Sequence, residues 1–181
     1  MTVCGIFSHS FGSQFQQRQH NMGSLLTRIN AQTPQTRMKV KRVHAALDND
    51  DVDALFIGRA MKILLPRYAI GSPQPGTQET VYHKCAKLQY SDNLRRLLDI
   101  CYQEFGDGGL TILDANNASP LLVAVCYNRV WFLDYFYSQQ DMCTFVFMKK
   151  TKGNVFCNEI IFPAQSNLLH AAVRLRIWVM F

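Results

Sequence analysis

One seven-residue pattern occurs four times in this chain, and it constrains the fold more than any other feature. The four copies, residues 41–47, 80–86, 119–125 and 167–173, align without gaps. Three of them carry His at the fourth place, and all four carry a small residue two places later: Ala46, Cys85, Ala124 and Ala172. Helices approach each other closely only where side chains are small. The pattern therefore predicts similar helices that pack side by side.

A second helix is expected after each of the first three copies. Val52 and Leu55 follow His44 by eight and eleven residues, and Val130 and Leu133 follow Leu122 at the same spacing. Apolar residues at this spacing lie on one helical face. We expect helix pairs within residues 39–66, 81–105 and 119–137, and a further helix start at 166–173. Ser119 as N-cap, Pro120 at the first helical position, Asn128 at the break between helices and Gly106 as a stop are the local signals.

The repeated pattern resembles the T-P-L-H-x-A-A signature of ankyrin repeats, over roughly residues 40–173. The resemblance implies units of a β-turn and two antiparallel helices, in which His44, His83, His170 and Pro120 have structural roles. Three units lack the proline, the glycine expected between helices is missing, and the connections are long. The expected fold is mainly α: a short ankyrin-like α-solenoid of helix pairs with an inserted β-hairpin.

The domain expected from this reading covers residues 39–181 and follows a flexible basic tail, residues 1–38. Its helix pairs lie near residues 39–70, 78–110, 117–141 and 164–181, the last incomplete. Between the third and fourth units, residues 144–148 and 155–162 are rich in β-forming side chains and flank a turn at 151–154. We therefore predict a hairpin insertion at 142–163, projecting from the turn side, with Lys149, Lys150 and Lys152 near its tip.

All the excess positive charge lies near the N-terminus. The net charge is +6, and residues 1–47 contain six basic residues and no acidic one, so the remaining chain is neutral. An organelle transit peptide or a membrane-surface helix is the alternative to a flexible tail. The basic stretch 37–42 suits phosphate contacts or an import signal, but it lacks the interleaved aromatic residues that stack on bases. We favour the solvated start of a helix, and we do not expect nucleic-acid binding.

Catalytic and metal sites are not expected. The six cysteines and the histidines form no C-x₂₋₄-C or H-x₃₋₅-H pair, and equivalent repeat positions would place His44, His83 and His170 in a row rather than around one ion. Residues 4–7 match the C-G-I-F start of amidotransferases with an N-terminal nucleophile, but the β-rich layers of that fold do not follow. We predict no enzyme activity, no metal and no cofactor.

The cysteine pattern and the hydropathy bear on location. No C-x-x-C pair and no signal peptide are present, so we expect reduced thiols and an intracellular, cytoplasmic protein. No apolar run reaches the length of a transmembrane helix. Divergent ankyrin repeats also resemble pathogen effectors that bind host proteins, which would place the chain in the host cytosol.

The ankyrin resemblance implies a module that binds another protein through its repeat turns and the concave face of its first helices. Position within the repeat suggests eight contact residues: Tyr82, Lys87, Asp107, Thr111, Asp114, Asn116, Tyr127 and Arg129. The apolar residues 177–181 follow a helix that has no partner helix, which leaves three readings open: the chain is a fragment, another chain covers the uncapped end in an oligomer, or these residues pack back on the third unit. Two alternatives remain: the targeting part of a larger enzyme or effector whose catalytic segment is absent, and a nucleic-acid-binding protein that uses the basic tail.

Overall fold

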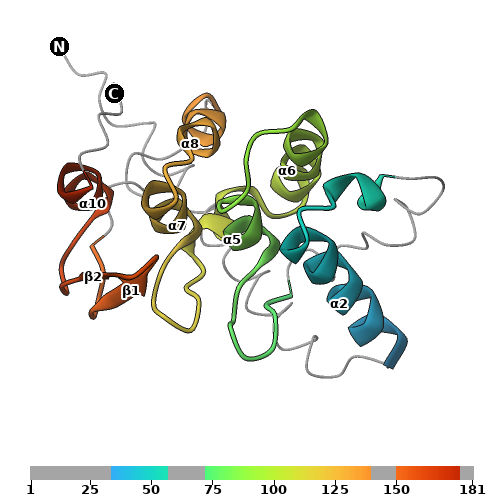
Figure 1. The fold of residues 1–181 in the computed structure, drawn as a ribbon, viewed down its shortest axis with the longest axis horizontal. Helices are drawn as coiled ribbons and strands as arrows, with labels where there is room; N and C mark the ends of the chain where they lie inside the picture. Colours follow the sequence, from blue (N-terminus) through green and yellow to red (C-terminus); the bar gives the residue numbers. More distant parts are fainter. Residues whose placement is uncertain (1–33, 57–71, 140–149, 176–181) are drawn as a thin grey trace, which may run out of the picture.

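The computed structural model describes residues 34–56, 72–139 and 150–175. These residues form a mainly helical structure with one small antiparallel hairpin (Figure 1). The α-helices are α2 (Pro34–Asp48), α5 (Val81–Cys85), α6 (Asp92–Phe105), α7 (Pro120–Cys126), α8 (Val130–Tyr137) and α10 (Leu168–Arg174). Two 3-10 helices, η1 (Val52–Leu55) and η2 (Gly106–Thr111), and two strands, β1 (Val155–Cys157) and β2 (Ile160–Phe162), complete it.

The helices that carry the repeated pattern lie in a row. Helix α2 packs against α5, α5 against α7, and α7 against α10. Helices α6 and α8 each pack on the helix that precedes them, and Figure 1 shows them along one side of the row. The loops that lead into α5 and α7 lie on the opposite side, together with the hairpin.

Most helix boundaries follow the local signals in the sequence. The hydroxyl of Ser119 accepts a hydrogen bond from the Leu122 amide at 3.3 Å, and Pro120 is the first residue of α7. Asn128 and Gly106 have positive φ angles of 53° and 54°, a conformation that asparagine and glycine adopt at low cost. The predicted start of α7, the break before α8 and the end of α6 are therefore confirmed.

Aromatic side chains join neighbouring helix pairs in the core. The ring of Phe136 in α8 lies 4.9 Å from Phe132 and 5.7 Å from Tyr82 of α5, measured between centroids. All three rings are fully buried. The small residues Cys85, Ala124 and Ala172 are buried as well, and they occupy the sites of helix-on-helix contact that the repeated pattern predicts.

The first unit differs from the prediction. Helix α2 begins at Pro34, inside the range expected to be tail, so the pattern that starts at Lys41 lies in the middle of a helix rather than at its cap. Val40 and Val43 are buried while Lys41 and Arg42 are exposed, as in the solvated helix we favoured for this basic stretch. The other residues of the tail lie outside the described part.

The hairpin also differs from the prediction. Val155 pairs with Phe162 and Cys157 with Ile160, so the turn lies at Asn158 and Glu159 rather than at residues 151–154. Both turn residues have positive φ, 46° and 64°, as the two-residue type I′ turn requires. A single β-rich run therefore folds back on itself, and the residues 144–148 expected to form the other strand lie outside the described part.

Candidate functional site

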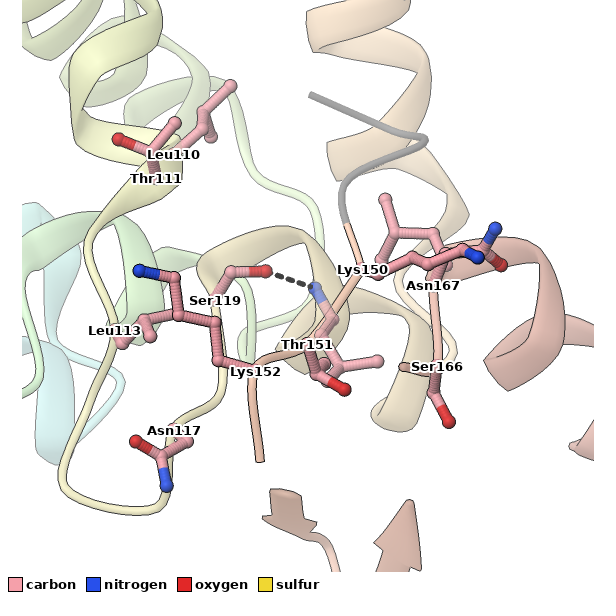
Figure 2. Close-up of a pocket in the computed structure, with 12 residues that line it drawn as sticks. Leu110, Thr111, Leu113, Asn117, Ser119, Lys150, Thr151, Lys152, Ser166 and Asn167 are labelled. Atoms are coloured by element: carbon pink, nitrogen blue, oxygen red, sulfur yellow. Dashed lines mark hydrogen bonds between the residues drawn. The ribbon is translucent and has the colours of Figure 1, made fainter. Parts of the chain in front are cut away.

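A pocket lies where the third and fourth copies of the repeated pattern meet, and its volume is about 160 Å³. The buried side chains Leu110, Leu122 and Leu168 and the half-exposed Leu113 form its apolar lining. Lys150 and Lys152, both exposed, border it. Figure 2 shows the segment 150–152 passing between the loop before α7 and the start of α10. The pocket is thus apolar within and positively charged at its edge.

Backbone hydrogen bonds hold both walls of the pocket. The Thr151 amide donates to the Ser166 carbonyl at 2.8 Å, and the Gln165 amide donates to the Thr151 carbonyl at 2.9 Å. On the other wall, the Asp114 carboxylate accepts hydrogen bonds from the amides of Asn116 and Ala118, both at 2.8 Å. Burial raises the pKa of Asp114, although these two donors oppose the shift. The loop before α7 is therefore fixed by its own buried carboxylate.

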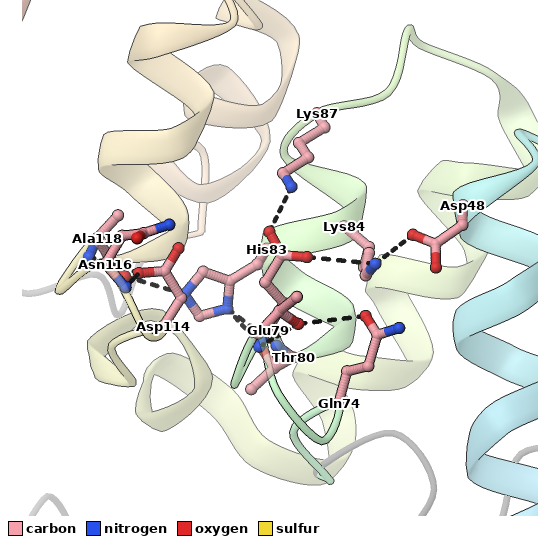
Figure 3. Close-up of polar contacts among 11 residues, drawn as sticks. Asp48, Gln74, Glu79, Thr80, His83, Lys84, Lys87, Asp114, Asn116 and Ala118 are labelled. Carbon is pink, nitrogen blue, oxygen red and sulfur yellow. Dashed lines mark hydrogen bonds and ion pairs between the residues drawn. The ribbon is translucent and has the colours of Figure 1, made fainter. Parts of the chain in front are cut away.

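A second polar cluster links α2 with α5 (Figure 3). The Glu79 carboxylate, only 8% exposed, forms ion pairs with Lys84 and Lys87, and Lys84 also pairs with Asp48 of α2. Burial opposes ionisation of Glu79, but the two lysines hold its pKa below the ordinary value. Removing one partner of such a buried pair leaves an uncompensated charge, so the cluster stabilises this particular packing of α2 and α5.

Two buried histidines bond the backbone of the next unit. His83 Nε2 lies 3.1 Å from the Ala118 carbonyl, and His83 Nδ1 accepts a hydrogen bond from the Thr80 amide at 3.1 Å. His44 Nε2 lies 3.0 Å from the Ser72 carbonyl. The contacts of His83 require the neutral ring with the proton on Nε2, and the contact of His44 requires a proton on its Nε2. Burial lowers the pKa of His83 to about 4 and also lowers that of His44.

The Nδ1 atoms of His170 and His44 have different surroundings, which shows how the units differ. His170 is exposed, and its Nδ1 accepts a hydrogen bond from the Asn167 amide at the start of α10. His44 Nδ1 is the one buried side-chain nitrogen or oxygen without a hydrogen-bond partner among the described residues. Its position explains this, because the residue three places earlier, Lys41, lies inside α2 and not at a helix start.

Four of the eight predicted contact residues are engaged inside the protein. Tyr82 is 1% exposed and its hydroxyl donates to the Gly106 carbonyl, so its side chain lies in the core and not on the surface. Asp114 is buried and bonds its own loop. Lys87 pairs with Glu79, and Arg129 Nε donates to the Lys87 carbonyl at 2.9 Å. Position in a repeat therefore did not separate buried side chains from accessible ones.

The other four have different surroundings. Thr111 lines the pocket, with its hydroxyl donating to the Gly108 carbonyl. Asn116 is exposed on the loop before α7. Tyr127 is half-buried, and the Lys87 ammonium lies 5.9 Å from its ring centroid. The side chain of Asp107 lies outside the described part. Only Thr111 therefore belongs to the pocket.

Sequence reasoning missed the residues that give both sites their chemistry. Leu113 is 43% exposed and lines the pocket, but Ile112 and Ala115 stand beside it in the sequence, so the sequence does not single it out. Lys84 occupies the fifth place of the repeated pattern, where the other copies have Ala45, Val123 and Ala171. A charge at a place that is otherwise apolar points to a buried partner. Glu79, however, carries no comparable signal.

Helix α10 exposes apolar side chains that the other units bury. Leu169 and Val173 are 50% and 70% exposed, whereas the residues at the same places in the third copy, Leu121 and Val125, are buried. Residues 177–181 lie outside the described part, so oligomerisation through this end stays a prediction.

The described residues form neither a metal-binding cluster nor a membrane-spanning helix. No group of three or more His, Cys, Asp and Glu side chains in this part of the chain is placed to hold a metal ion. Likewise, none of the helices described above has the length and hydropathy needed to cross a membrane.

Comparisons of the chain with protein-family models, curated proteins and solved structures found no match.

Proposed function

We propose that this protein is a protein–protein interaction module, built as a short ankyrin-like stack of helix pairs. It binds a partner through the pocket between the loop before α7 and the segment 150–152. The observation that carries the proposal is the combination of an apolar interior with two exposed lysines at its edge.

The row of contacts α2–α5–α7–α10 supports the ankyrin-like arrangement. So do the hydrogen bonds from His44 to the loop before α5 and from His83 to the loop before α7, because each connects one unit to the next. A stack of this kind holds its loops in fixed relative positions, and a preorganised surface loses less entropy when a partner binds.

The size and charge of the pocket define its occupant. Pockets for drug-sized ligands and cofactors usually measure about 300–1,000 Å³. A volume of about 160 Å³ is smaller and suits one large apolar side chain. Lys150 and Lys152 favour acidic residues beside it, since complementary charge guides association and selects partners. The proposed partner segment therefore carries a Leu, Ile, Met or Phe next to Asp or Glu.

A peptide selection tests this proposal. The full chain is immobilised and a random peptide library is selected against it; enriched peptides are then measured by fluorescence anisotropy. We expect a large apolar residue flanked by acids. The variant Lys150→Glu/Lys152→Glu should weaken binding at least about tenfold, because it turns attraction into repulsion. Leu113→Ser should weaken it by removing apolar lining.

Two matched variants serve as controls. Lys41→Glu reverses the charge of an exposed lysine on α2, and Leu169→Ser changes an exposed leucine on α10 outside the pocket. Both should bind the selected peptides like the wild type. Selection of peptides without acids, or equal losses in the pocket and control variants, would show that the pocket is not the binding site.

A further inference from the structure

Two cysteines from different parts of the chain meet where the hairpin packs on α7. Cys126 is the last residue of α7 and Cys157 is the last residue of β1, and both are buried. Helix α7 packs against β1. They are 31 residues apart in the sequence, so this proximity comes from the fold.

Hydrogen bonds fix the backbone beside both cysteines. The side-chain amide of Asn158, next to Cys157, donates to the Cys126 carbonyl at 2.9 Å. On the other side, the Phe156 amide donates to the Asn116 carbonyl in the loop before α7. The two residues that flank Cys157 therefore hold the hairpin to the end of α7 and to the loop before it.

The two thiols lie close enough to change each other's ionisation. The hydrogen bond with Cys126 lowers the pKa of Cys157, although burial opposes this shift, while the same contact and burial raise the pKa of Cys126. A lowered pKa favours the thiolate, which is the form that reacts with disulfides. By contrast, burial raises the pKa of Cys85, which lies inside the helical core.

We infer that Cys126 and Cys157 are a redox pair, which forms a reversible disulfide that locks the hairpin 155–162 onto α7. Glutathione disulfide is a sufficient oxidant. The Cys157 thiolate attacks one of its sulfurs and releases one glutathione thiolate. Cys126 then loses its proton, attacks the Cys157 sulfur of the mixed disulfide and releases the second. Two protein thiols are oxidised and one glutathione disulfide is reduced to two glutathione molecules.

The Cys126–Cys157 disulfide should have measurable effects on stability and on the hairpin. A disulfide that closes a loop of about 30 residues restricts the unfolded chain, and we expect Tm to rise by about 10 °C. The amides of residues 155–162 should also exchange more slowly with deuterium, since the hairpin can no longer separate from α7. These effects compare oxidised and reduced forms of the same chain, so they do not depend on any substitution.

The test equilibrates the full chain with mixtures of reduced and oxidised glutathione, blocks free thiols and maps disulfides by mass spectrometry. We expect a dominant Cys126–Cys157 peptide that dithiothreitol reverses, with the Tm rise and slower exchange in the oxidised form. Cys157→Ala and Cys126→Ala should show no cross-linked peptide, no rise in Tm and no slower exchange of the hairpin amides. Cys101→Ala, at a buried cysteine of α6, and Cys143→Ala should retain all three effects. A different dominant pair, a statistical mixture, or a cross-link without slower hairpin exchange would overturn the inference.

Discussion

The buried imidazole of His83 makes stability depend on pH in a defined way. Its pKa in the folded protein is about 4, against an ordinary value of about 6.5. Burial is the largest cause; the Ala118 carbonyl and the Glu79 charge act in the opposite direction. Below pH 6.5 the unfolded chain therefore takes up a proton that the folded chain does not.

The sign and size of the effect follow from proton linkage. Stability is unaffected by this group above pH 6.5, falls as the pH drops from 6.5 to 4, and stays lowered below that. Each unit of pKa difference corresponds to about 1.4 kcal/mol, so His83 should cost about 3 kcal/mol of unfolding free energy by pH 4. Burial lowers the pKa of His44 as well, and its effect has the same sign.

The comparison of wild type with His83→Gln isolates this contribution. Glutamine retains one donor and one acceptor but takes up no proton in this range. Urea unfolding, followed by circular dichroism between pH 7.5 and 4, should show the variant less stable at pH 7.5, because the hydrogen bonds to Thr80 and Ala118 are imperfectly replaced. The difference in unfolding free energy between the two proteins should then decrease by about 3 kcal/mol as the pH falls to 4. Parallel curves for the two proteins would refute the reasoning, as would an NMR titration of the His83 ring near pH 6.5.

Substitutions at Gly109 and Ser119 test the packing around Tyr82 and the cap of α7. Gly109→Ala should lower the free energy of unfolding by about 1–3 kcal/mol, because the added Cβ would overlap the buried Tyr82 ring. The control is Gly153→Ala, which adds a Cβ in open space and should change the free energy of unfolding by less than about 0.5 kcal/mol. Equal effects in urea unfolding would contradict this. Ser119→Ala should lower the free energy of unfolding by about 1 kcal/mol, because it removes the cap of α7. Ser119→Asp should retain most of the stability, since aspartate also caps helices. If Ser119→Ala leaves the free energy of unfolding unchanged, the cap is unimportant.

Local signals in the sequence were sufficient for most helix boundaries. Ser119, Pro120, Gly106 and Asn128 act through their own backbone preferences and hydrogen bonds to residues a few places away. The start of α2 was missed because the repeated pattern alone does not show how far a helix extends before it. The hairpin turn was misplaced because Gly153 is a common turn residue, while Asn158 and Glu159 adopt positive φ within one β-rich run.

The sequence by itself determined the start of α7, the break before α8 and the end of α6, because caps and turn residues act over a few residues. Only the tertiary structure decided which polar atoms have hydrogen-bond or ion-pair partners inside the protein. It buried Tyr82, enclosed Glu79 between Lys84 and Lys87, placed Lys150 and Lys152 beside the pocket, and brought Cys126 to Cys157. Apart from the ion pairs of Glu79, these contacts join distant parts of the chain, and their partners depend on how whole helix pairs pack.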